Sequence, residues 1–367
     1  MTSADGTGPA RGEDVTSVAA ERGPLTMAAV ALGKDFRLGR GQVLHAVRGV
    51  SLGLYRGAVV ALVGESGSGK STVARLLAGQ ERPTAGSIRL DGAPVELSGR
   101  RAFRRHKSKV QLVFQDPFSS LNPVHTVRYH LDRPVRLHQG KRGDEAAREV
   151  AALLAQVRLT PAGNFLGKFP HELSGGQRQR VSFARALAAR PSVLLADEPV
   201  SMLDVSIRLE MLGLLDDLRR RFQLAMLYIT HDIASARYFA DEVLVMYGGE
   251  IVERGPAEEL TQRPAHPYTQ LLVASAPDPD NLGSTLRGGT ATGGTATGGT
   301  ATGARQPAGT GPAATGCPFS ARCPLAEDRC RTDDPPLLRV SAVRAAACWR
   351  LDVAAPGILA QSQGGGT

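Results

Sequence analysis

A stretch of glycines, serines and one lysine has the composition and spacing of a phosphate-binding loop. It fits the pattern G-x-x-x-x-G-K-[ST] and follows a short β-branched run, Val59–Val63, that is typical of a buried strand. Its residues are Gly64, Glu65, Ser66, Gly67, Ser68, Gly69, Lys70, Ser71 and Thr72. Glycines let backbone N–H groups curl around phosphate oxygens, and a helix that begins at Lys70 adds its positive dipole end. We expect Lys70 to reach the β and γ phosphates of a nucleotide and the Ser71 hydroxyl to bind Mg²⁺.

Two acidic residues follow a second apolar run. Val193–Ala196 is a predicted strand, and it ends in Asp197 and Glu198. Beside a phosphate-binding loop, Asp197 can hold Mg²⁺ through water, and Glu198 can polarise an attacking water as a general base. Taken alone, such a pair is more often a solvated end of a strand.

The elements around these residues indicate an α/β domain. Between about residues 28 and 255, apolar runs typical of strands alternate with helical patterns. One predicted helix begins near Asp144, and another has an apolar face formed by Ile207, Met211, Leu214, Leu215, Leu218 and Phe222. Aromatic residues make up only 5% of the chain, so we expect a core of mainly Ala, Val and Leu.

Composition divides the 367 residues into six segments. The predicted segments are a disordered tail (1–27), a nucleotide-binding domain (28–256), a helical segment (257–285), a flexible Gly/Thr/Ala linker (286–313), a small cysteine-containing module (314–354) and a second disordered tail (355–367).

The apolar and charged content limits the class of protein. No apolar run approaches the ~18 residues that a membrane-spanning helix needs, and the N-terminal residues lack the apolar core of a signal peptide, so we expect a cytosolic location. The net charge of +9 is compatible with nucleic acid, an anionic membrane or a nucleotide as partner, and also with an Arg-rich solvated surface. We interpret the basic run Arg100–Lys109 as a solvated helix rather than a nucleic-acid site.

Further motifs, in their order along the chain, resemble those of the ABC ATPases. One segment of the chain resembles the signature motif of that family: Leu173, Ser174, Gly175, Gly176 and Gln177. The other matches are Phe36 (the aromatic residue that stacks on adenine), Gln115 (the Q-loop glutamine), Ser201–Asp204 (the D-loop, with Asp204 as its acid) and His231 (the switch histidine). The resemblance covers about residues 28 to 255.

This resemblance implies a P-loop NTPase of the ABC ATPase type, with a RecA-like core, an antiparallel β subdomain and a helical subdomain. Two such domains would pack head to tail around ATP, so that Ser174 and Gly176 act on the partner's nucleotide. Gln115 would help to bind Mg²⁺ and water, and His231 would contact the γ-phosphate and orient Glu198. Because the set of motif residues is intact, the resemblance implies ATP hydrolysis rather than binding alone.

Three segments resemble the oligopeptide/dipeptide importer branch of that family, namely Phe114–Pro123, His266–Leu272 and Gly316–Pro324. The branch implies an importer with a second ATPase subunit (identical or related), two transmembrane permease subunits and an extracellular solute-binding protein. The chain would then lie at the cytoplasmic face of the cell membrane, held by the permeases, with no nucleic-acid partner. Peptides are the leading cargo. Oligosaccharide or metal-chelate cargo, or a soluble ABC ATPase that acts on nucleic acid, are the alternatives.

The chain has four cysteines, with the spacing C-x5-C-x6-C-x17-C. They are Cys317, Cys323, Cys330 and Cys348. Four thiolates meet the ligand requirement of an iron–sulfur cluster or of zinc, although no C-x-x-C pair favours a zinc ribbon. Some importer ATPases of the resembled branch carry a cluster on similarly spaced cysteines, which implies a [4Fe–4S] cluster here. Zinc and free buried thiols remain open, and Arg322 and Arg329 either offset thiolate charge or are solvated.

Overall fold

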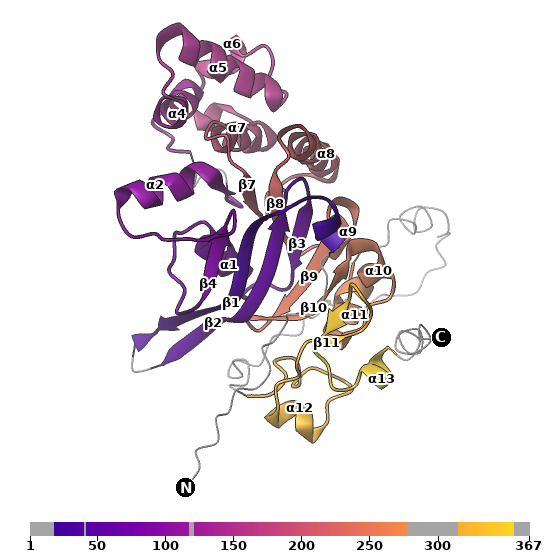
Figure 1. The fold of residues 1–367 in the computed structure, drawn as a ribbon. Helices are drawn as coiled ribbons and strands as arrows, with labels where there is room; N and C mark the ends of the chain where they lie inside the picture. The colour runs from indigo at the N-terminus through magenta and orange to yellow at the C-terminus, as the bar shows by residue number, and fades with distance from the viewer. Residues whose placement is uncertain (1–17, 40–41, 117–120, 277–314, 356–367) are drawn as a thin grey trace, which may run out of the picture.

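The computed structural model describes residues 18–39, 42–116, 121–276 and 315–355. Figure 1 shows a central sheet, a second sheet beside it, a group of helices at one end and the C-terminal segment at the other. The predicted linker 286–313 lies outside the described residues, as do most of the predicted tails and the repeat within the linker.

The larger sheet has the strand order β11-β12-β10-β9-β3-β8-β7-β6. Its strands are β3 (Val59–Val63), β6 (Val110–Val113), β7 (Val193–Asp197), β8 (Ala225–Thr230), β9 (Glu242–Tyr247), β10 (Glu250–Pro256), β11 (Leu338–Arg339) and β12 (Ala345–Ala346). Strands β6, β7, β8, β3 and β9 pair in parallel. Because parallel strands end at the same edge of a sheet, the segments that follow β3, β7 and β8 meet there.

The smaller sheet is antiparallel and has the order β2-β1-β4-β5. Its strands are β1 (Leu25–Arg37), β2 (Val43–Tyr55), β4 (Ala85–Leu90) and β5 (Ala93–Pro94). A 3-10 helix, η1 (Val18–Glu21), precedes β1, and both Ala19 and Met27 are fully buried. Residues 18–27 therefore belong to the fold, which corrects the tail predicted over 1–27. Their apolar side chains are too few to show a period in the sequence.

Helices cover the large sheet and extend beyond one end of it. They are α1 (Lys70–Leu77), α2 (Arg100–Lys109), α4 (Val127–Pro134), η3 (Val135–Gln139), α5 (Gly143–Gln156), α6 (Gly163–Leu166), η4 (Pro170–Glu172), α7 (Gly175–Leu187), α8 (Val205–Phe222), α9 (Ile233–Phe239), α10 (Ala257–Gln262), α11 (Pro267–Ala274), α12 (Asp328–Thr332) and α13 (Leu351–Ala354). The segments α4 to α7 form a helical subdomain at the top of Figure 1. The helices predicted near Asp144 and around Met211 are confirmed as α5 and α8.

The buried strand β3 separates two apolar cores. Val60 and Leu62 pack with α1 and the antiparallel sheet. Val59, Ala61 and Val63 face the other core, which includes side chains of the helical subdomain and the C-terminal module. All five residues are at most 1% exposed, which explains why this strand is apolar throughout rather than alternating.

The C-terminal module extends the large sheet. Strand β12 pairs antiparallel with β10, and a buried ion pair joins Arg344 to Glu253 at 3.2 Å. Arg344 also donates to the carbonyl of Arg263 at 2.5 Å. The module predicted over 314–354 is therefore built onto the nucleotide-binding domain through its sheet.

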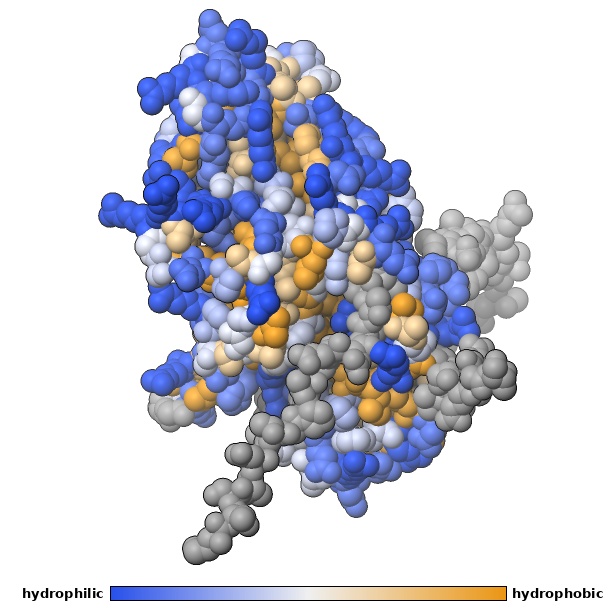
Figure 2. Space-filling model, in the orientation of Figure 1, coloured by the Kyte–Doolittle hydropathy of each residue, from blue (hydrophilic) through white to orange (hydrophobic). Residues whose placement is uncertain are grey.

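The surface is hydrophilic over the tip of the helical subdomain on the face seen in Figure 2. In α2 only His106 is buried, and Phe103 is 42% exposed, as expected for a solvated basic helix. Among the described residues, no helix combines the length and the apolar character needed to cross a bilayer.

Candidate nucleotide-binding site

The loop after β3 is held against its neighbours by glycines. Gly69 has φ of 103°, and a Cβ at this residue would lie 2.3 Å from the carbonyl oxygen of Ala46. A Cβ at Gly64 would lie 2.1 Å from the carbonyl oxygen of Met246. Only glycine permits this left-handed turn and these close approaches, so the loop enters α1 at Lys70 as the motif predicted.

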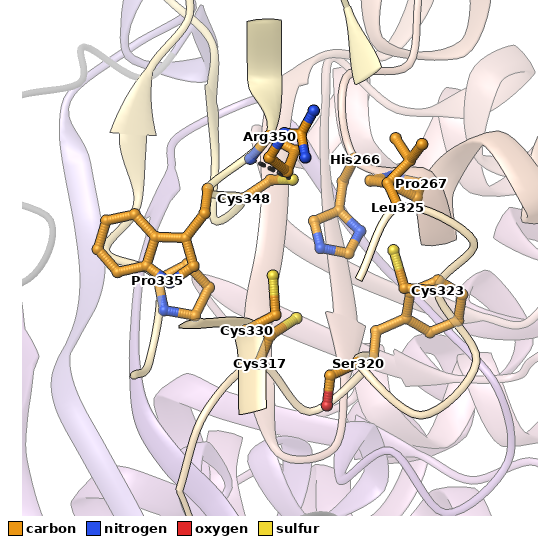
Figure 3. Close-up of a pocket in the computed structure, with 12 residues that line it drawn as sticks. His266, Pro267, Cys317, Ser320, Cys323, Leu325, Cys330, Pro335, Cys348 and Arg350 are labelled. Carbon is orange, nitrogen blue, oxygen red and sulfur yellow. Dashed lines mark hydrogen bonds between the residues drawn. The ribbon is translucent and has the colours of Figure 1, made fainter. Parts of the chain in front are cut away.

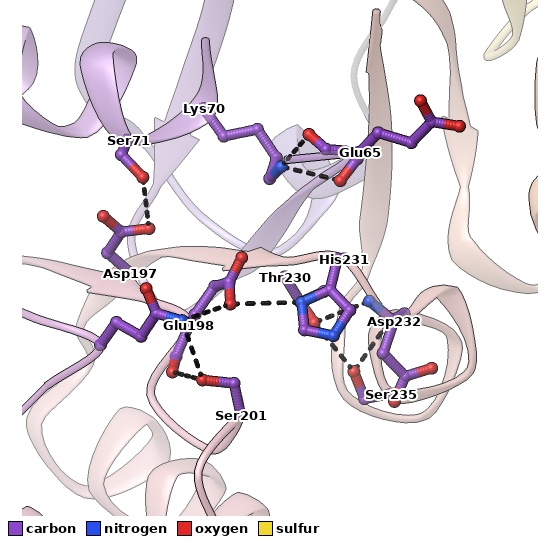
Figure 4. A network of polar contacts seen from close by, with 12 residues as sticks. Glu65, Lys70, Ser71, Asp197, Glu198, Ser201, Thr230, His231, Asp232 and Ser235 are labelled. Carbon is purple, nitrogen blue, oxygen red and sulfur yellow. Dashed lines mark hydrogen bonds and ion pairs between the residues drawn. The ribbon is translucent and has the colours of Figure 1, made fainter. Parts of the chain in front are cut away.

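The Lys70 side chain folds back onto its own loop (Figure 4). Its Nζ donates to the carbonyl oxygens of Gly64 and Glu65, both at 2.7 Å, and lies 3.4 Å from the Ser68 hydroxyl. Burial lowers the pKa of Lys70 from its ordinary value, against the opposing effect of Glu198 and Asp197. A cation desolvated in this way gains from a nearby polyanion, which fits a phosphate group in this loop.

Ser71 and Asp197 bring two oxygens together from different elements. The Ser71 Oγ donates to Asp197 Oδ1 at 3.1 Å, across α1 and β7. Burial raises the pKa of Asp197, and the hydrogen bond from Ser71 opposes that shift. A desolvated carboxylate beside a hydroxyl is a suitable partner for a hard divalent cation, so these residues fit the Mg²⁺ expected with the nucleotide.

Glu198 is the centre of a polar cluster (Figure 4). Gln115 Nε2 donates to Glu198 Oε2 at 3.0 Å, and His231 Nδ1 lies 3.2 Å from the same oxygen. The Ser201 hydroxyl donates to the Glu198 carbonyl oxygen at 3.0 Å. Glu198 has φ of 46°, a strained conformation for a residue with a side chain, and such strain is common at functional sites. The structure thus places His231 against Glu198, as expected, and adds a hydrogen bond from Gln115 that was not predicted.

A hydrogen-bonded turn positions His231, and its members were not predicted. The Asp232 amide donates to Thr230 Oγ1 at 3.0 Å, and Ser235 Oγ donates to the Asp232 carbonyl oxygen at 2.8 Å. Tyr228 then donates to Ser235 at 3.2 Å. The signal in the sequence was the polar triplet Thr-His-Asp at the end of an apolar strand, where Asp caps the next helix.

The signature turn lies in the helical subdomain, at the start of α7. Ser174 is the N-cap, and it forms a capping box in which its Oγ accepts from the Gln177 amide at 3.2 Å while Gln177 Oε1 accepts from the Ser174 amide. Gly175 lies in the same first turn, and the Gly176 backbone packs near Ile207 of α8, which has Asp204 as its N-cap. Ser174 is exposed, and among the described residues no hydrogen bond links Ser174 or Gln177 to the loop at Lys70.

Phe36 lies at the end of the β1–β2 pair that borders the phosphate-binding loop. Phe36 pairs with Leu44. Two residues later in the same strand is Ala46, whose carbonyl oxygen leaves no room for a side chain at Gly69. The ring is half-buried, and the Lys34 ammonium lies 4.9 Å from its centroid. This location is compatible with stacking on a base. Stacking of Phe36 on adenine stays a prediction, as do the contacts of Ser66, Gly67 and Thr72 with phosphate.

Comparison with known proteins decides the family. Residues 47–201 match the family described as ABC transporter, and residues 252–330 match the family described as oligopeptide/dipeptide transporter, C-terminal region. The di/tripeptide transport ATP-binding protein DppF of Pseudomonas aeruginosa is 40% identical over 84% of this chain and 91% of its own length. The chain belongs to the ABC transporter family. The oligopeptide transport ATP-binding protein AppF of Bacillus subtilis is 39% identical, over 83% of this ABC chain and 89% of its own length.

Solved structures agree with this assignment. A dimeric, post-hydrolysis structure of the ATP-binding cassette MJ0796, bound to ADP and Pi, is 28% identical to this chain with a TM-score of 0.58. The match covers 63% of this ABC chain and 99% of that cassette. The predicted P-loop fold of the ABC type is therefore confirmed, and the chain is an ABC-type ATPase.

The four cysteines line one cavity, together with the buried ring of His266 (Figure 3). In that view the imidazole lies between Cys323 and the other three thiols. Burial raises the pKa of Cys317 to about 12 and that of Cys348 to about 11, so both thiols are protonated at neutral pH when no metal is bound. Within the described ranges, no group of three or more His, Cys, Asp or Glu side chains is arranged to hold a metal ion. The expected iron–sulfur cluster is thus not supported.

The two arginines of this module have other partners than thiolates. Arg322 forms an ion pair with Glu65 of the phosphate-binding loop. The Arg329 guanidinium lies 3.6 Å from the centroid of the Trp349 ring and 3.7 Å from the Asp333 carboxylate. Both arginines thus pair with carboxylates and aromatic rings rather than with the cysteines, and both side chains are partly exposed, as in the solvated alternative.

Proposed function

We propose that this chain is the ATP-hydrolysing subunit of a membrane importer for di- and oligopeptides. The observation that carries the enzymatic part is the contact of Glu198 with both Gln115 and His231, next to Lys70 and the Ser71–Asp197 pair. The names of the relatives, a di/tripeptide and an oligopeptide transport ATP-binding protein, support the cargo.

Each residue of the cluster has a distinct role in this proposal. Lys70 releases the loop carbonyls and binds the β and γ phosphates, while the backbone amides of residues 67–72 surround them. Ser71, Asp197 and Gln115 hold Mg²⁺, which neutralises phosphate charge when it is bound. Glu198 accepts a proton from the attacking water, and the hydrogen bond from Gln115 and the contact with His231 hold its carboxylate in place.

A second ATPase subunit completes the site. The signature turn lies at the N-terminus of α7. Ser174 and Gly175 are exposed, Gln177 is half-exposed and Gly176 is buried. The N-terminus of a helix attracts phosphate through its dipole. We infer that this turn, with Asp204 of the D-loop beside it, closes the nucleotide site of the partner ATPase in a head-to-tail dimer.

The permease subunits dock on the helical subdomain. A cavity of about 490 Å³ opens between β6 and the helices α4 and α7. Its lining includes Gln111, Asn122, His125, Tyr129, Arg133 and Leu137. Leu137 is 54% exposed, and Val124 nearby in the chain is 69% exposed. A groove with this polar and apolar mixture suits a short helix of one transmembrane subunit. The second ATPase subunit would receive the other transmembrane subunit, and these contacts would hold the chain at the cytoplasmic face of the membrane.

Reconstitution tests this function. The chain would be combined with its cognate permease pair, a second ATPase and a solute-binding protein in vesicles, and ATP hydrolysis and uptake measured with labelled peptides, oligosaccharides and metal chelates. We expect peptide to stimulate hydrolysis and to enter the vesicles. Stimulation by an oligosaccharide or a chelate alone would reject peptide cargo, and hydrolysis stimulated by nucleic acid without permeases would reject the importer.

A further inference from the structure

Glu65 is held at three points by separate parts of the chain. Its amide donates to the Tyr268 hydroxyl at 2.8 Å, and its carbonyl oxygen accepts from Lys70 Nζ at 2.7 Å. Its carboxylate accepts from Arg322 Nη1 at 2.8 Å and Nη2 at 3.1 Å. One residue of the phosphate-binding loop thus connects Lys70 with α11 and with the C-terminal module, 257 positions away.

Aromatic rings next to the guanidinium orient the Arg322 side chain toward Glu65. Its guanidinium lies 5.9 Å from the Tyr247 ring and 5.7 Å from the Phe319 ring. These two rings and that of Tyr268 pack on one another at centroid distances between 4.6 and 5.4 Å. A planar guanidinium that stacks on aromatic rings loses less conformational freedom when it makes a bidentate pair.

The module itself has a fixed position relative to the loop. The pairing of β12 with β10 and the buried Arg344–Glu253 pair attach it to the large sheet. Strand β10 pairs with β9, and β9 pairs with β3, from which the phosphate-binding loop begins. The large sheet therefore fixes both the module that contains Arg322 and the loop that contains Glu65.

The charge of Glu65 makes this contact relevant to nucleotide binding. A carboxylate in a loop that receives a polyanion repels it, and the side chain of Glu65 is only 35% exposed, so solvent screens its charge incompletely. The bidentate pair with Arg322 offsets that charge. It also directs the carboxylate toward the module.

We propose that Arg322 is a positioning residue of the nucleotide site, through which the C-terminal module increases the affinity of the phosphate-binding loop for MgATP. It acts through Glu65, whose charge it neutralises and whose backbone it helps to hold. The inference rests on the proposed assignment of residues 64–72 to the phosphates. It adds a residue outside the nucleotide-binding domain to that site.

The test is the affinity of the purified full-length chain for labelled MgATP, measured by equilibrium dialysis at low ionic strength. We expect Arg322→Gln to raise the Kd about fivefold, the upper end for a partly exposed ion pair. Arg322→Lys keeps the charge without the bidentate geometry, so it should raise the Kd only about twofold. Arg329→Gln, which removes an arginine of the same module that contacts Trp349 and Asp333, is the matched control and should bind like the wild type.

A merely structural role for Arg322 would not give the next two results. In a Glu65→Gln background, Arg322→Gln should change the Kd less than about twofold, because the charge that it neutralises is gone. In about 1 M salt the difference between wild type and Arg322→Gln should also disappear, because the screening length falls to about 3 Å. An affinity loss that persists in the Glu65→Gln background, or in high salt, would overturn the proposal, as would wild-type affinity of Arg322→Gln at low salt.

Lys70→Ala separates this inference from the site assignment. If Lys70→Ala keeps the wild-type affinity, the assignment of the loop to the phosphates fails, and the inference fails with it. If Lys70→Ala loses MgATP binding while Arg322→Gln binds like the wild type, only the role of Arg322 is rejected.

Discussion

The nucleotide site and the cysteine cavity are both assembled from residues far apart in the sequence, but they differ in what fixes their side chains. Lys70 and His231 follow strands β3 and β8, and Asp197 is the last residue of β7. These three strands run side by side and end at one edge. Cys330 lies in the short helix α12, and the other three cysteines lie outside helices and strands. Spacing along the chain is therefore most informative where regular elements determine the direction of each side chain.

The largest expected effect tests the nucleotide side of this comparison. Glu198→Gln keeps the shape of the side chain and its contacts with Gln115 and His231, but removes the base. We expect the rate of ATP hydrolysis by the assembled transporter to fall about a thousandfold, with MgATP still bound. Hydrolysis and binding would be measured on the same preparation. An unchanged rate would show that another group accepts the proton.

The second effect tests whether the module is part of the ATPase fold. Arg344→Leu leaves Glu253 buried without its cation, although the amides of Ala265 and His266 still donate to it. We expect a loss of about 3 kcal/mol in the free energy of unfolding, measured with urea. Arg136→Gln, which breaks an exposed pair with Asp132, is the control and should cost less than about 1 kcal/mol. Equal losses would contradict the buried attachment.

The third effect is a pH dependence at the cavity. Burial lowers the pKa of His266 from 6.5 to about 4, and its Nδ1 accepts from the Tyr268 amide. Between these two pKa values the unfolded chain binds the proton and the folded chain does not, so stability is lost as the pH falls below 6.5. This group should destabilise the fold by about 2 kcal/mol at pH 5 relative to pH 7.5.

Unfolding midpoints across this pH range would be compared with those of His266→Asn. Asparagine can accept the same amide hydrogen bond at the helix N-cap but does not titrate. The variant should therefore show a shallower loss of stability toward pH 5. Parallel curves for the two proteins would mean that His266 is not the group responsible.

The smallest effect addresses the thiols. Cys323 is the least buried of the four cysteines, and its replacement by serine changes little volume. Without a shared metal, we expect Cys323→Ser to cost less than about 1 kcal/mol of stability. A loss of several kcal/mol, together with loss of visible absorbance in anaerobically purified protein, would establish a cluster and reverse the contrast between the two regions.

The sequence predicted most of the nucleotide site, for a physical reason. A β-branched strand, a glycine turn and the start of a helix determine the backbone around Lys70 within about a dozen residues. The local sequence is therefore sufficient to predict the conformation of this loop. The pairing of β12 with β10, and the contact of Arg322 with Glu65, depend on packing between distant segments. No local periodicity indicates them. The strained backbone at Glu198 was also invisible, because glutamate seldom adopts a positive φ.

The attachment of β12 to β10 has a consequence for how the protein is made. Arg344 lies 91 positions after Glu253, the residue with which it pairs. During synthesis the strand β10 is complete long before its outer neighbour leaves the ribosome. Until then its edge is open to other strands, a known route to aggregation. We expect nascent chains arrested before β12 to depend on chaperones, even though every residue that we propose to contact ATP in the same subunit has already been translated.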